Sequence, residues 1–436
     1  MKAKQWWLTG LIAVLLFVAG CGGAGGGNDA ATDGNNGGAE GGNAGGDVTL
    51  KLFNFKVEMA EQLDRLVAEY EKETGVKIAT ETCGGGCDYS AALKTKFSSG
   101  DKPDIFFVAG HSDLDLWLEH VEDLSDQPWV QDVHEFAKVP MTKDGKLYGM
   151  PLNLEGWGFI YNKDLFAQAG ITETPKTLSE LSAAAEKLKA AGITPFMNGY
   201  AEWWVLGNHL LNMGFALQPD PVAFIEGIKA GTEKIPGNAV LNEWMNLFDL
   251  TIKYGQPNPL QTDYNTQVTS FATGQAAMTQ QGNWTQVQLT QTNPDLNIGF
   301  LPMPINDSPE MDKLPVGVPN NWVVHKNSAH KDEAKAFLNW LVTSETGKRY
   351  IVEEFKFIPA LKTIPANEEQ LGPLAADIIK YSNEGKTVPW VWQRYPGYEA
   401  NTSQMSSAMQ GYIGGQLTKE QMFEEFQRIW DEFSKQ

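Results

Sequence analysis

Residues 48–110 alternate between strand-like and helix-like segments, and this alternation constrains the fold more than any other feature of the chain. Apolar runs rich in β-branched and aromatic side chains predict three strands, at residues 48–55, 76–80 and 103–110. Two predicted helices lie between them, at residues 58–74 and 89–99. Strands separated by helices form a parallel sheet. The first part of the folded chain is therefore predicted to be an α/β lobe.

Polar side chains follow the first and third of these strands. Asn54 and Lys56 come after the first strand, and Gly110, His111 and Asp113 come after the third. The carboxyl ends of parallel strands meet at one edge of a sheet, and ligands bind beyond that edge. We therefore expect these residues to share a rim that faces a ligand.

A further strand-like stretch, residues 156–161, has the sequence GWGFIY, in which glycines separate large side chains. Such a run predicts a buried strand that another group approaches closely. Glu155 stands at its head, and a charged group is costly to bury unless a partner meets it. We interpret the stretch as the crossing between two lobes, with Glu155 facing a ligand between them. An edge strand with a solvated Glu155 is the alternative.

The N-terminus has the pattern of an exported lipoprotein. Lys2 and Lys4 precede an apolar core of about a dozen residues, which is shorter than the roughly 20 needed to span a membrane. This order of charged and apolar regions is typical of a secretory signal, here residues 1–20. Cys21 follows two small residues, as in a bacterial lipobox, so cleavage before Cys21 and a lipid on its sulfur are predicted. A plain signal peptide with an incidental cysteine is the alternative.

Residues 21–47 contain almost only Gly, Asn, Ala and Asp after the cysteine. A segment without large apolar side chains cannot bury enough surface to fold, so we predict a flexible tether. The remaining residues, 48–436, are too many for one ordinary core and suggest two domains.

The formal net charge is −20, from 54 acidic and 34 basic residues. An acidic balance of this size argues against nucleic acid, anionic lipid and anionic substrates as partners. No second apolar run is long enough to span a membrane, so the lipid is the only membrane contact that we expect.

Cys83 and Cys87 bracket three glycines, which allow the backbone to turn tightly enough to bring the two sulfurs together. In an exported protein this spacing favours a disulfide. A metal site is the alternative, although no nearby His or third Cys supports it. We expect the bridge to be a local staple beside a ligand loop.

Aromatic side chains gather in turns and loops of the second half of the chain. They form three groups: Glu202–Trp204, Asn283 with Trp284, and Trp390 with Trp392. Loops rich in exposed aromatic side chains usually bind something. Trp244, by contrast, has core spacing within a predicted helix at 238–254 and is expected to be structural.

Six motifs occur in this order: PDIFFVAGH, DGKLYGMP, EGWGFIYNKDLF, a GITPF turn at 192–196, FATGQAAMTQQGNW and EAKAFLNWLVTSETG, the last a predicted helix at 333–347. In this order they resemble the extracellular solute-binding lipoproteins (family 1) that deliver sugars to ABC importers, relatives of maltose-binding protein. The resemblance covers essentially all of residues 48–436. It implies the type II periplasmic-binding-protein-like fold, in which two α/β lobes, each a mainly parallel sheet flanked by helices, are joined by a hinge. The lobes would comprise residues 48–156 plus about 315–358, and residues 157–314 plus about 359–436.

The resemblance also implies separate permease and ATPase subunits as partners. Consistent with that division, the chain has no phosphate loop of the GxxxxGK[ST] type. We therefore expect a monomeric binding protein without catalytic residues, cofactor or metal ion, anchored at the extracellular face of the cell membrane by Cys21.

The family's binding positions carry over to these residues: Asn54, Lys56, Gly110, His111, Glu155, Glu202, Trp203, Trp204, Trp284, Trp390 and Trp392. Where the family has an acidic residue and an arginine after the third strand, this chain has Gly110 and His111. That departure leaves the identity of the ligand open but keeps its class.

The same residue types suit a sugar on physical grounds. A pyranose has C–H patches on its faces, which aromatic rings cover, and hydroxyls at its edge, which carboxylates and amides bind. The candidate rings are Trp157, Trp203, Trp204, Trp284, Trp390 and Trp392, and the candidate acceptors are Asp113, Glu155, Glu202 and Asn283. Any single tryptophan could instead fill the core. The number of rings predicts a neutral oligosaccharide as the ligand.

Two other classes of function are weighed against this interpretation. A secreted glycoside hydrolase would also place paired carboxylates, here Glu155 and Glu202, beside tryptophans. The lipobox and the crossover pattern suit a binding protein better. A metal or peptide binder of the same fold is disfavoured because the six histidines are scattered and no fixed charge pair stands out.

Overall fold

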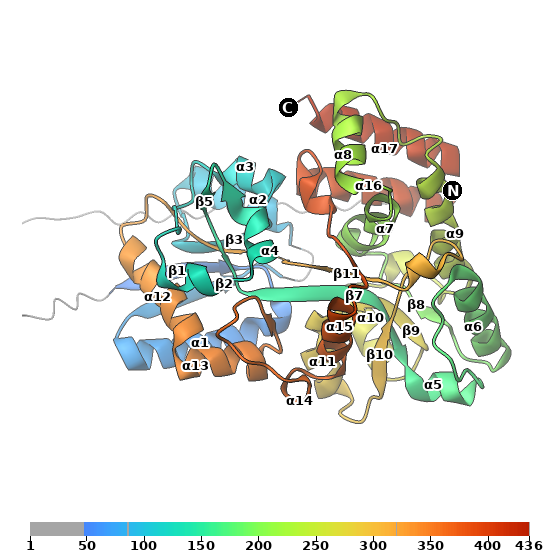
Figure 1. The fold of residues 1–436 in the computed structure, drawn as a ribbon, viewed down its shortest axis with the longest axis horizontal. Coiled ribbons are helices and arrows are strands. Elements are labelled where there is room, and N and C mark those ends of the chain that lie inside the picture. Colours follow the sequence, from blue (N-terminus) through green and yellow to red (C-terminus); the bar gives the residue numbers. More distant parts are fainter. Residues whose placement is uncertain (1–47, 85–86, 320, 436) are drawn as a thin grey trace, which may run out of the picture. The chain divides into compact units, whose positions relative to one another are not determined.

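The computed structural model describes residues 48–84, 87–319 and 321–435 (Figure 1). The signal peptide predicted at 1–20, the lipidated Cys21 and the tether at 21–47 lie outside the described residues. Within the described part, no helix is both long enough and apolar enough to cross a membrane.

The first sheet has five strands in the order β2-β1-β3-β12-β6. Their bounds are β1 Thr49–Asn54, β2 Lys77–Thr82, β3 Ile105–Val108, β6 Met150–Pro151 and β12 Asn321–Val324. β1 is parallel to both β2 and β3, and the helices α1 (Ala60–Thr74) and α2 (Tyr89–Ser99) lie between these strands in sequence, which confirms the predicted alternation. β12 is antiparallel to β3 and to β6. The sheet is therefore mixed.

The second sheet is built around β7 (Asn153–Asn162), the longest strand described. Its other strands are β8 Phe196–Met197, β9 Met278–Gly282, β10 Ile298–Leu301, β11 Leu314–Gly317, β13 Ile358–Pro359 and β14 Thr387–Val388. β7 is antiparallel to β9, β10, β11 and β13, while β8 pairs with β9 and β14 pairs with β11 in parallel. The expectation of mainly parallel sheets is wrong. The strands that pair with β7 run in the opposite direction to it, so most of the pairing in this sheet is antiparallel.

β7 carries the crossing from the first sheet to the second (Figure 1). β6 ends at Pro151, and only Leu152 separates it from β7. Along β7, Leu154 pairs with β13, Glu155 with β11, and Trp157 with β9. The alternative of a solvated Glu155 is excluded, since this side chain is buried. Three strand segments thus meet at the crossing, as a multi-stranded hinge requires.

Side-chain caps define the starts of the two helices that follow β7. Asn162 caps α5 (Lys163–Gln168), and Thr177 forms a capping box with Glu180 at the start of α6 (Leu178–Ala190). Trp244 is fully buried within α9 (Ala239–Lys253), as its spacing predicts. The remaining elements are α3 Ser112–Trp117, α4 Glu135–Lys138, β4 Thr142–Lys143, β5 Lys146–Leu147, α7 Leu211–Ala216, α8 Pro221–Ala230, α10 Tyr264–Ala272, α11 Gln286–Thr292, α14 Glu368–Leu371, α15 Pro373–Asn383, α16 Tyr398–Ile413 and α17 Lys419–Phe433.

The single helix predicted at 333–347 is in fact two, α12 (Lys331–Thr343) and α13 (Glu345–Arg349). Ser344 breaks it, because its backbone is extended (ψ 153°) and its hydroxyl accepts the Gly347 N–H at 2.9 Å. A serine that caps the next helix competes with the backbone bonds that would continue the previous one.

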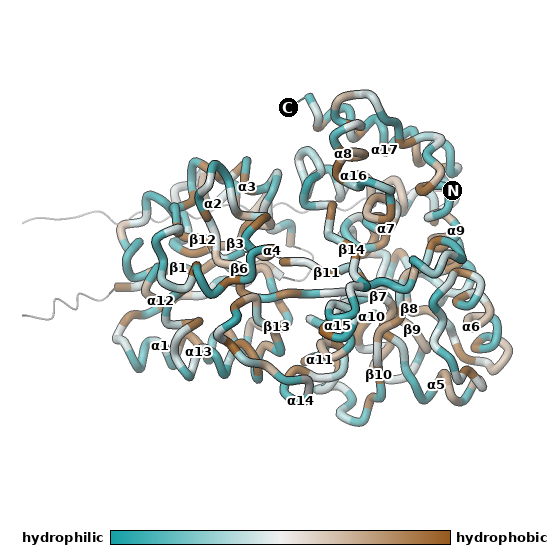
Figure 2. Tube along the Cα trace, in the orientation of Figure 1, coloured by the Kyte–Doolittle hydropathy of each residue, from teal (hydrophilic) through white to brown (hydrophobic). Residues whose placement is uncertain are grey.

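Hydrophobic segments concentrate on the strands of each sheet, whereas polar segments cover the outer helices such as α1 and α6 (Figure 2). β3 and β12, which lie side by side in the first sheet, are buried along their whole length. The lobe boundaries given above remain a prediction.

Candidate ligand-binding cleft

A cleft of about 1010 Å³ lies between residues that follow the strands of the first sheet and residues of the second. Nine predicted site residues line it: Lys56, Asp113, Glu155, Glu202, Trp203, Trp204, Trp284, Trp390 and Trp392. The cleft volume suits an extended small-molecule ligand. The described residues contain no group of three or more His, Cys, Asp or Glu side chains placed to hold a metal ion.

Lys56 joins two carboxylates at the centre of the cleft. Its Nζ lies 2.6 Å from Oε1 of Glu155 and 2.8 Å from Oε1 of Glu58. Lys56 is 5 % exposed and Glu155 2 %. Burial opposes the charge of Lys56, but the two carboxylates outweigh burial and raise the pKa of the ammonium. Burial raises the pKa of Glu155 against the charge of Lys56.

This arrangement fixes Glu155 with one oxygen available. Its Oε1 accepts from Lys56 and also from Nδ2 of Asn153, at 3.0 Å. No described residue donates to Oε2 of the same carboxylate. An oxygen held in place at a cleft wall is suited to accept a hydrogen bond from a ligand hydroxyl.

His209 lies within a group of aromatic rings that forms one wall. Its ring stacks on Trp157 with centroids 4.5 Å apart, and it contacts Trp284 at 5.1 Å and Trp204 at 5.2 Å. Burial lowers the pKa of His209 to about 3, so the imidazole is neutral at physiological pH. Nδ1 of this ring lies within hydrogen-bond distance of the Gln280 side-chain amide, 3.0 Å from its Nε2.

Trp284 is placed by the turn before it. Its indole N–H donates to Oε1 of Gln281 at 3.1 Å. Its ring packs on Gly282, where a Cβ atom would lie 2.0 Å from the ring. Gly282 has φ −121°, a conformation open to any residue, so it is the missing side chain and not the backbone that this position requires. Trp284 lines the cleft, as expected for a candidate ring of the site.

The loop at 389–396 brings two more rings to the cleft. Trp390 and Trp392 lie 5.5 Å apart, and Trp392 stacks on Tyr398 at 4.9 Å. The indole N–H groups of both tryptophans are buried and have no partner among the described residues. The loop is tied to the start of α3, because the hydroxyl of Ser112 contacts the carbonyl oxygens of Gln393 and Tyr395 at 2.7 and 2.8 Å.

Two carboxyl groups face the cleft near this loop. Asp113 lies at the start of α3 and accepts the Ala109 N–H at 2.8 Å, while Glu399 lies at the start of α16. Burial raises the pKa of Asp113 to about 6. Burial, together with the charge of Asp113, raises the pKa of Glu399 to about 8. Asp113 is therefore close enough to Glu399 to affect the ionisation of that carboxyl group.

Three of the predicted rim residues do not line the cleft. Asn54 is fully buried and shapes the turn after β1: its Oδ1 accepts the Lys56 N–H at 2.9 Å, and its Nδ2 donates to the Lys56 carbonyl. Gly110 has φ +93° and packs against Pro140, where a Cβ would lie 2.6 Å away. His111 also has positive φ, and its N–H bonds Pro140. Both residues serve a tight turn and do not form the contact surface expected of them.

Two further candidates lie behind the lining. Trp157 is fully buried and supports His209 and Trp390 from below the surface. Asn283 is also buried, and its Oδ1 accepts the Gly156 N–H at 3.0 Å, which joins the turn before α11 to β7. Their geometry assigns them to the support of the site.

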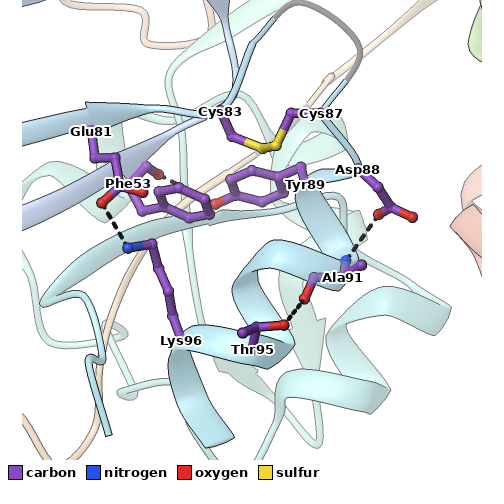
Figure 3. Close-up of a disulfide and its surroundings, with 9 residues drawn as sticks. All are labelled: Phe53, Glu81, Cys83, Cys87, Asp88, Tyr89, Ala91, Thr95 and Lys96. Carbon is purple, nitrogen blue, oxygen red and sulfur yellow. Dashed lines mark hydrogen bonds and ion pairs between the residues drawn. A yellow bond between two sulfur atoms is a disulfide. The ribbon is translucent and has the colours of Figure 1, made fainter. Parts of the chain in front are cut away.

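The sulfurs of Cys83 and Cys87 are bonded to each other, with Cα atoms 5.6 Å apart (Figure 3). Both residues line the cleft. The bridge lies just before α2, which Asp88 caps through the Ala91 N–H. Next in the chain, Tyr89 stacks on Phe53 at 4.9 Å. The staple thus lies beside the end of β1, where the Cys83 N–H donates to the Asn54 carbonyl at 2.8 Å.

Comparison with known proteins decides the family. The family model described as bacterial extracellular solute-binding protein matches residues 56–348, which is more than half of the chain. This chain belongs to that family. The solute-binding protein is 25% identical over 315 residues to the "Multiple sugar-binding protein" of Streptococcus mutans, covering 70% of this chain and 73% of the relative. It is also 25% identical over 301 residues to the melibiose/raffinose/stachyose-binding protein MelE of Bacillus subtilis, covering 65% of this chain and 67% of the relative.

Solved structures give the same fold. A chitin oligosaccharide binding protein superposes with a TM-score of 0.77 and 26% identity, covering 89% of this chain and all of the other. The binding protein RafE in complex with raffinose superposes with a TM-score of 0.73 and 22% identity over 89% of this chain and 100% of that one. The solute-binding protein therefore has the two-lobed type II fold.

Sequence reasoning missed part of the lining. Glu58, His209, Tyr264, Tyr398 and Glu399 all line the cleft. Glu58 follows Lys56 by two residues, and Glu399 follows the aromatic loop. Both could have been predicted because they lie close in sequence to candidate residues. His209 lies in an apolar helical stretch whose sequence gives no sign of a cleft.

Proposed function

We propose that this protein is the substrate-binding component of an ABC importer, which captures a neutral oligosaccharide in the cleft and delivers it to the permease. The observation that carries the proposal is the joint lining of one cleft by tryptophan rings and fixed carboxylates. Rings cover the C–H faces of a pyranose, and carboxylates accept from the hydroxyls at its edge.

The relatives support a sugar as the ligand. MelE is described as binding melibiose, raffinose and stachyose, and another relative, from Pyrococcus abyssi, as binding maltotriose. The solved relative with 26% identity is described as binding chitin oligosaccharides. All of these include ligands of more than one sugar unit, in agreement with the number of rings along the cleft.

In the proposed mechanism, each lobe supplies part of the site. The first lobe contributes Lys56, Glu58 and Asp113, and the second contributes Glu202, Trp203, Trp204 and Trp284. A ligand that touches both sides stabilises the closed arrangement of the lobes by its additional contacts there. Bending would occur where β7, β11 and β13 meet, and the importer would recognise the closed form.

We further propose that Cys21 is lipidated and that residues 21–47 tether the folded part at the extracellular face of the membrane. The protein would act as a monomer. It would release the sugar unchanged, because a binding protein delivers its ligand to the permease without catalysing a reaction. Retention of the protein in the membrane fraction, lost when Cys21 is replaced by serine, would support the anchor.

The first experiment is thermal unfolding of the purified protein against a panel of neutral oligosaccharides. A ligand that binds only the folded state raises the unfolding midpoint by mass action. We expect one glycan class to raise it, and Trp284→Ala to remove the shift. A shift with peptides or metal ions and with no sugar would refute the carbohydrate proposal. Small-angle scattering with and without the active sugar tests closure, and superimposable profiles would contradict it.

A further inference from the structure

The lining of the cleft is unbalanced in charge. Seven acidic side chains line it, against Lys56 as the one Lys or Arg in the lining: Glu58, Glu61, Asp113, Glu155, Glu202, Asp263 and Glu399. Lys56 is already bound by Glu58 and Glu155. None of the other five carboxyl groups forms an ion pair with a described residue. A neutral ligand would leave this charge uncompensated.

Two of the five are brought together from distant parts of the chain. Asp113 belongs to α3, which follows the first sheet, and Glu399 belongs to α16, near the C-terminus. The segments around them are joined, because Ser112 bonds the carbonyl oxygens of Gln393 and Tyr395. Like charges held close together in a partly buried place repel each other unless a cation or a proton intervenes.

The groups around this pair supply no strong cation. From α2 and its cap, Asp88 adds negative charge, Ser90 hydrogen bonds to Glu399, and Lys94 acts only weakly on Asp113. Trp117 of α3 and the Ala109 N–H contact Asp113. The charges of both carboxylates help to raise the pKa of the Tyr89 and Tyr398 phenols, in addition to burial. Burial raises the pKa of Asp113 to about 6, and burial together with the charges of Asp113 and Asp88 raises the pKa of Glu399 to about 8.

A second, independent observation at the same end of the cleft indicates a ligand. The indole N–H of Trp392 has no hydrogen-bond partner, although Trp392 is 4 % exposed and lines the cleft. Its ring stacks on Tyr398, the neighbour of Glu399. Burying a donor without a partner costs free energy, so a ligand oxygen that accepts from this N–H would be stabilising. Aromatic faces beside carboxylates also favour a cation.

We propose that the sugar bound at this end of the cleft is an amino sugar, whose ammonium group binds between Asp113 and Glu399 while a neighbouring ring oxygen or hydroxyl accepts from Trp392. An amino sugar has the cation and the acceptor oxygen on adjacent carbon atoms, which a plain hexose does not. The proposal rests on the proposed function, because it names one unit of an otherwise neutral oligosaccharide. It concerns the chemistry of the ligand and adds no catalytic step.

The test compares matched ligands by titration calorimetry at low ionic strength. Each pair of oligosaccharides, built on glucose, galactose and N-acetylglucosamine scaffolds, differs only in whether one hydroxyl or acetamido group is replaced by a free amine. We expect an aminated ligand to bind at least tenfold more tightly than its neutral partner at pH 7. We also expect its binding to release protons at pH 7, seen as a buffer-dependent heat, because the ammonium displaces the proton of Glu399.

Variants and pH identify the site. The advantage of the amine should disappear at pH 5, where both carboxyl groups are protonated, and in Glu399→Gln and Asp113→Asn. It should persist in Glu424→Gln, which removes an exposed carboxylate on α17. If neutral sugars bind and no aminated partner binds more tightly, the inference is overturned and the proposed function stands. If no sugar of either kind binds, both are overturned.

Discussion

Replacing Lys56 with methionine should destabilise the protein far more than the loss of an ordinary surface ion pair. The substitution keeps most of the side-chain volume but removes the ammonium that lies 2.6 Å from Glu155 and 2.8 Å from Glu58. Removing one partner of a buried pair leaves an uncompensated charge, with a cost of about 3–5 kcal/mol. The matched control is Lys51→Met, because Lys51 pairs with Asp101 at 2.6 Å but both side chains are more than half exposed. That change should cost at most about 1 kcal/mol.

The pH dependence gives the sharper test of this reasoning. Burial raises the pKa of Glu155 above its unfolded value even with Lys56 present. Without Lys56 the pKa should rise further, and a group with a raised folded-state pKa destabilises the fold as pH rises through that pKa. The penalty of Lys56→Met should therefore be larger at pH 7 than at pH 5 in urea unfolding. Glu155→Gln in the same background should relieve it. A penalty no larger than that of Lys51→Met, or one that is equal at both pH values, would refute the argument.

Three further predictions concern the rings and the disulfide. In a calorimetric titration, Gly282→Ala should lower sugar affinity by about tenfold or more, because the new Cβ displaces the Trp284 ring. The control, Gly411→Ala on α16 away from the cleft, should leave the affinity unchanged. Trp244→Ala should cost about 3–5 kcal/mol of stability in urea unfolding, since a fully buried ring leaves a cavity, and a loss below about 1 kcal/mol would contradict its core role. Cys83→Ser with Cys87→Ser should cost about 2 kcal/mol by the loop-entropy model for so short a loop, and wild-type protein in reductant should unfold at the same urea concentration as the variant.

The elements predicted best are those whose signals are local. The alternating segments of residues 48–110 depend on neighbours a few positions apart, and they are confirmed. The direction of strand pairing is a different matter. β12 lies between β3 and β6, about 170 residues from β6 in sequence, and nothing in its own four residues says which strands it will meet. For that reason the mixed character of both sheets could not be predicted.

The candidate site was predicted in outline, because some of its residues have local signals and others do not. Aromatic and acidic side chains in predicted turns, such as Trp284 and Glu202, were recognised as candidates, and they line the cleft. Asn54 and Gly110 were assigned to contact because they follow strands, yet they shape the turns that position their neighbours. His209 was missed because its role comes from three rings, Trp157, Trp204 and Trp284, that converge only in three dimensions.

The place of β12 within the first sheet has a consequence for the order of events during synthesis. β1, β2 and β3 leave the ribosome early, but β6 has no partner in this sheet until residues 321–324 have been made. The second sheet likewise waits for β14 at Thr387–Val388. A nascent chain that completes neither sheet until most of it has been translated stays without a closed core for longer than one built from consecutive domains. Such a chain remains open to being threaded through a narrow channel before it folds.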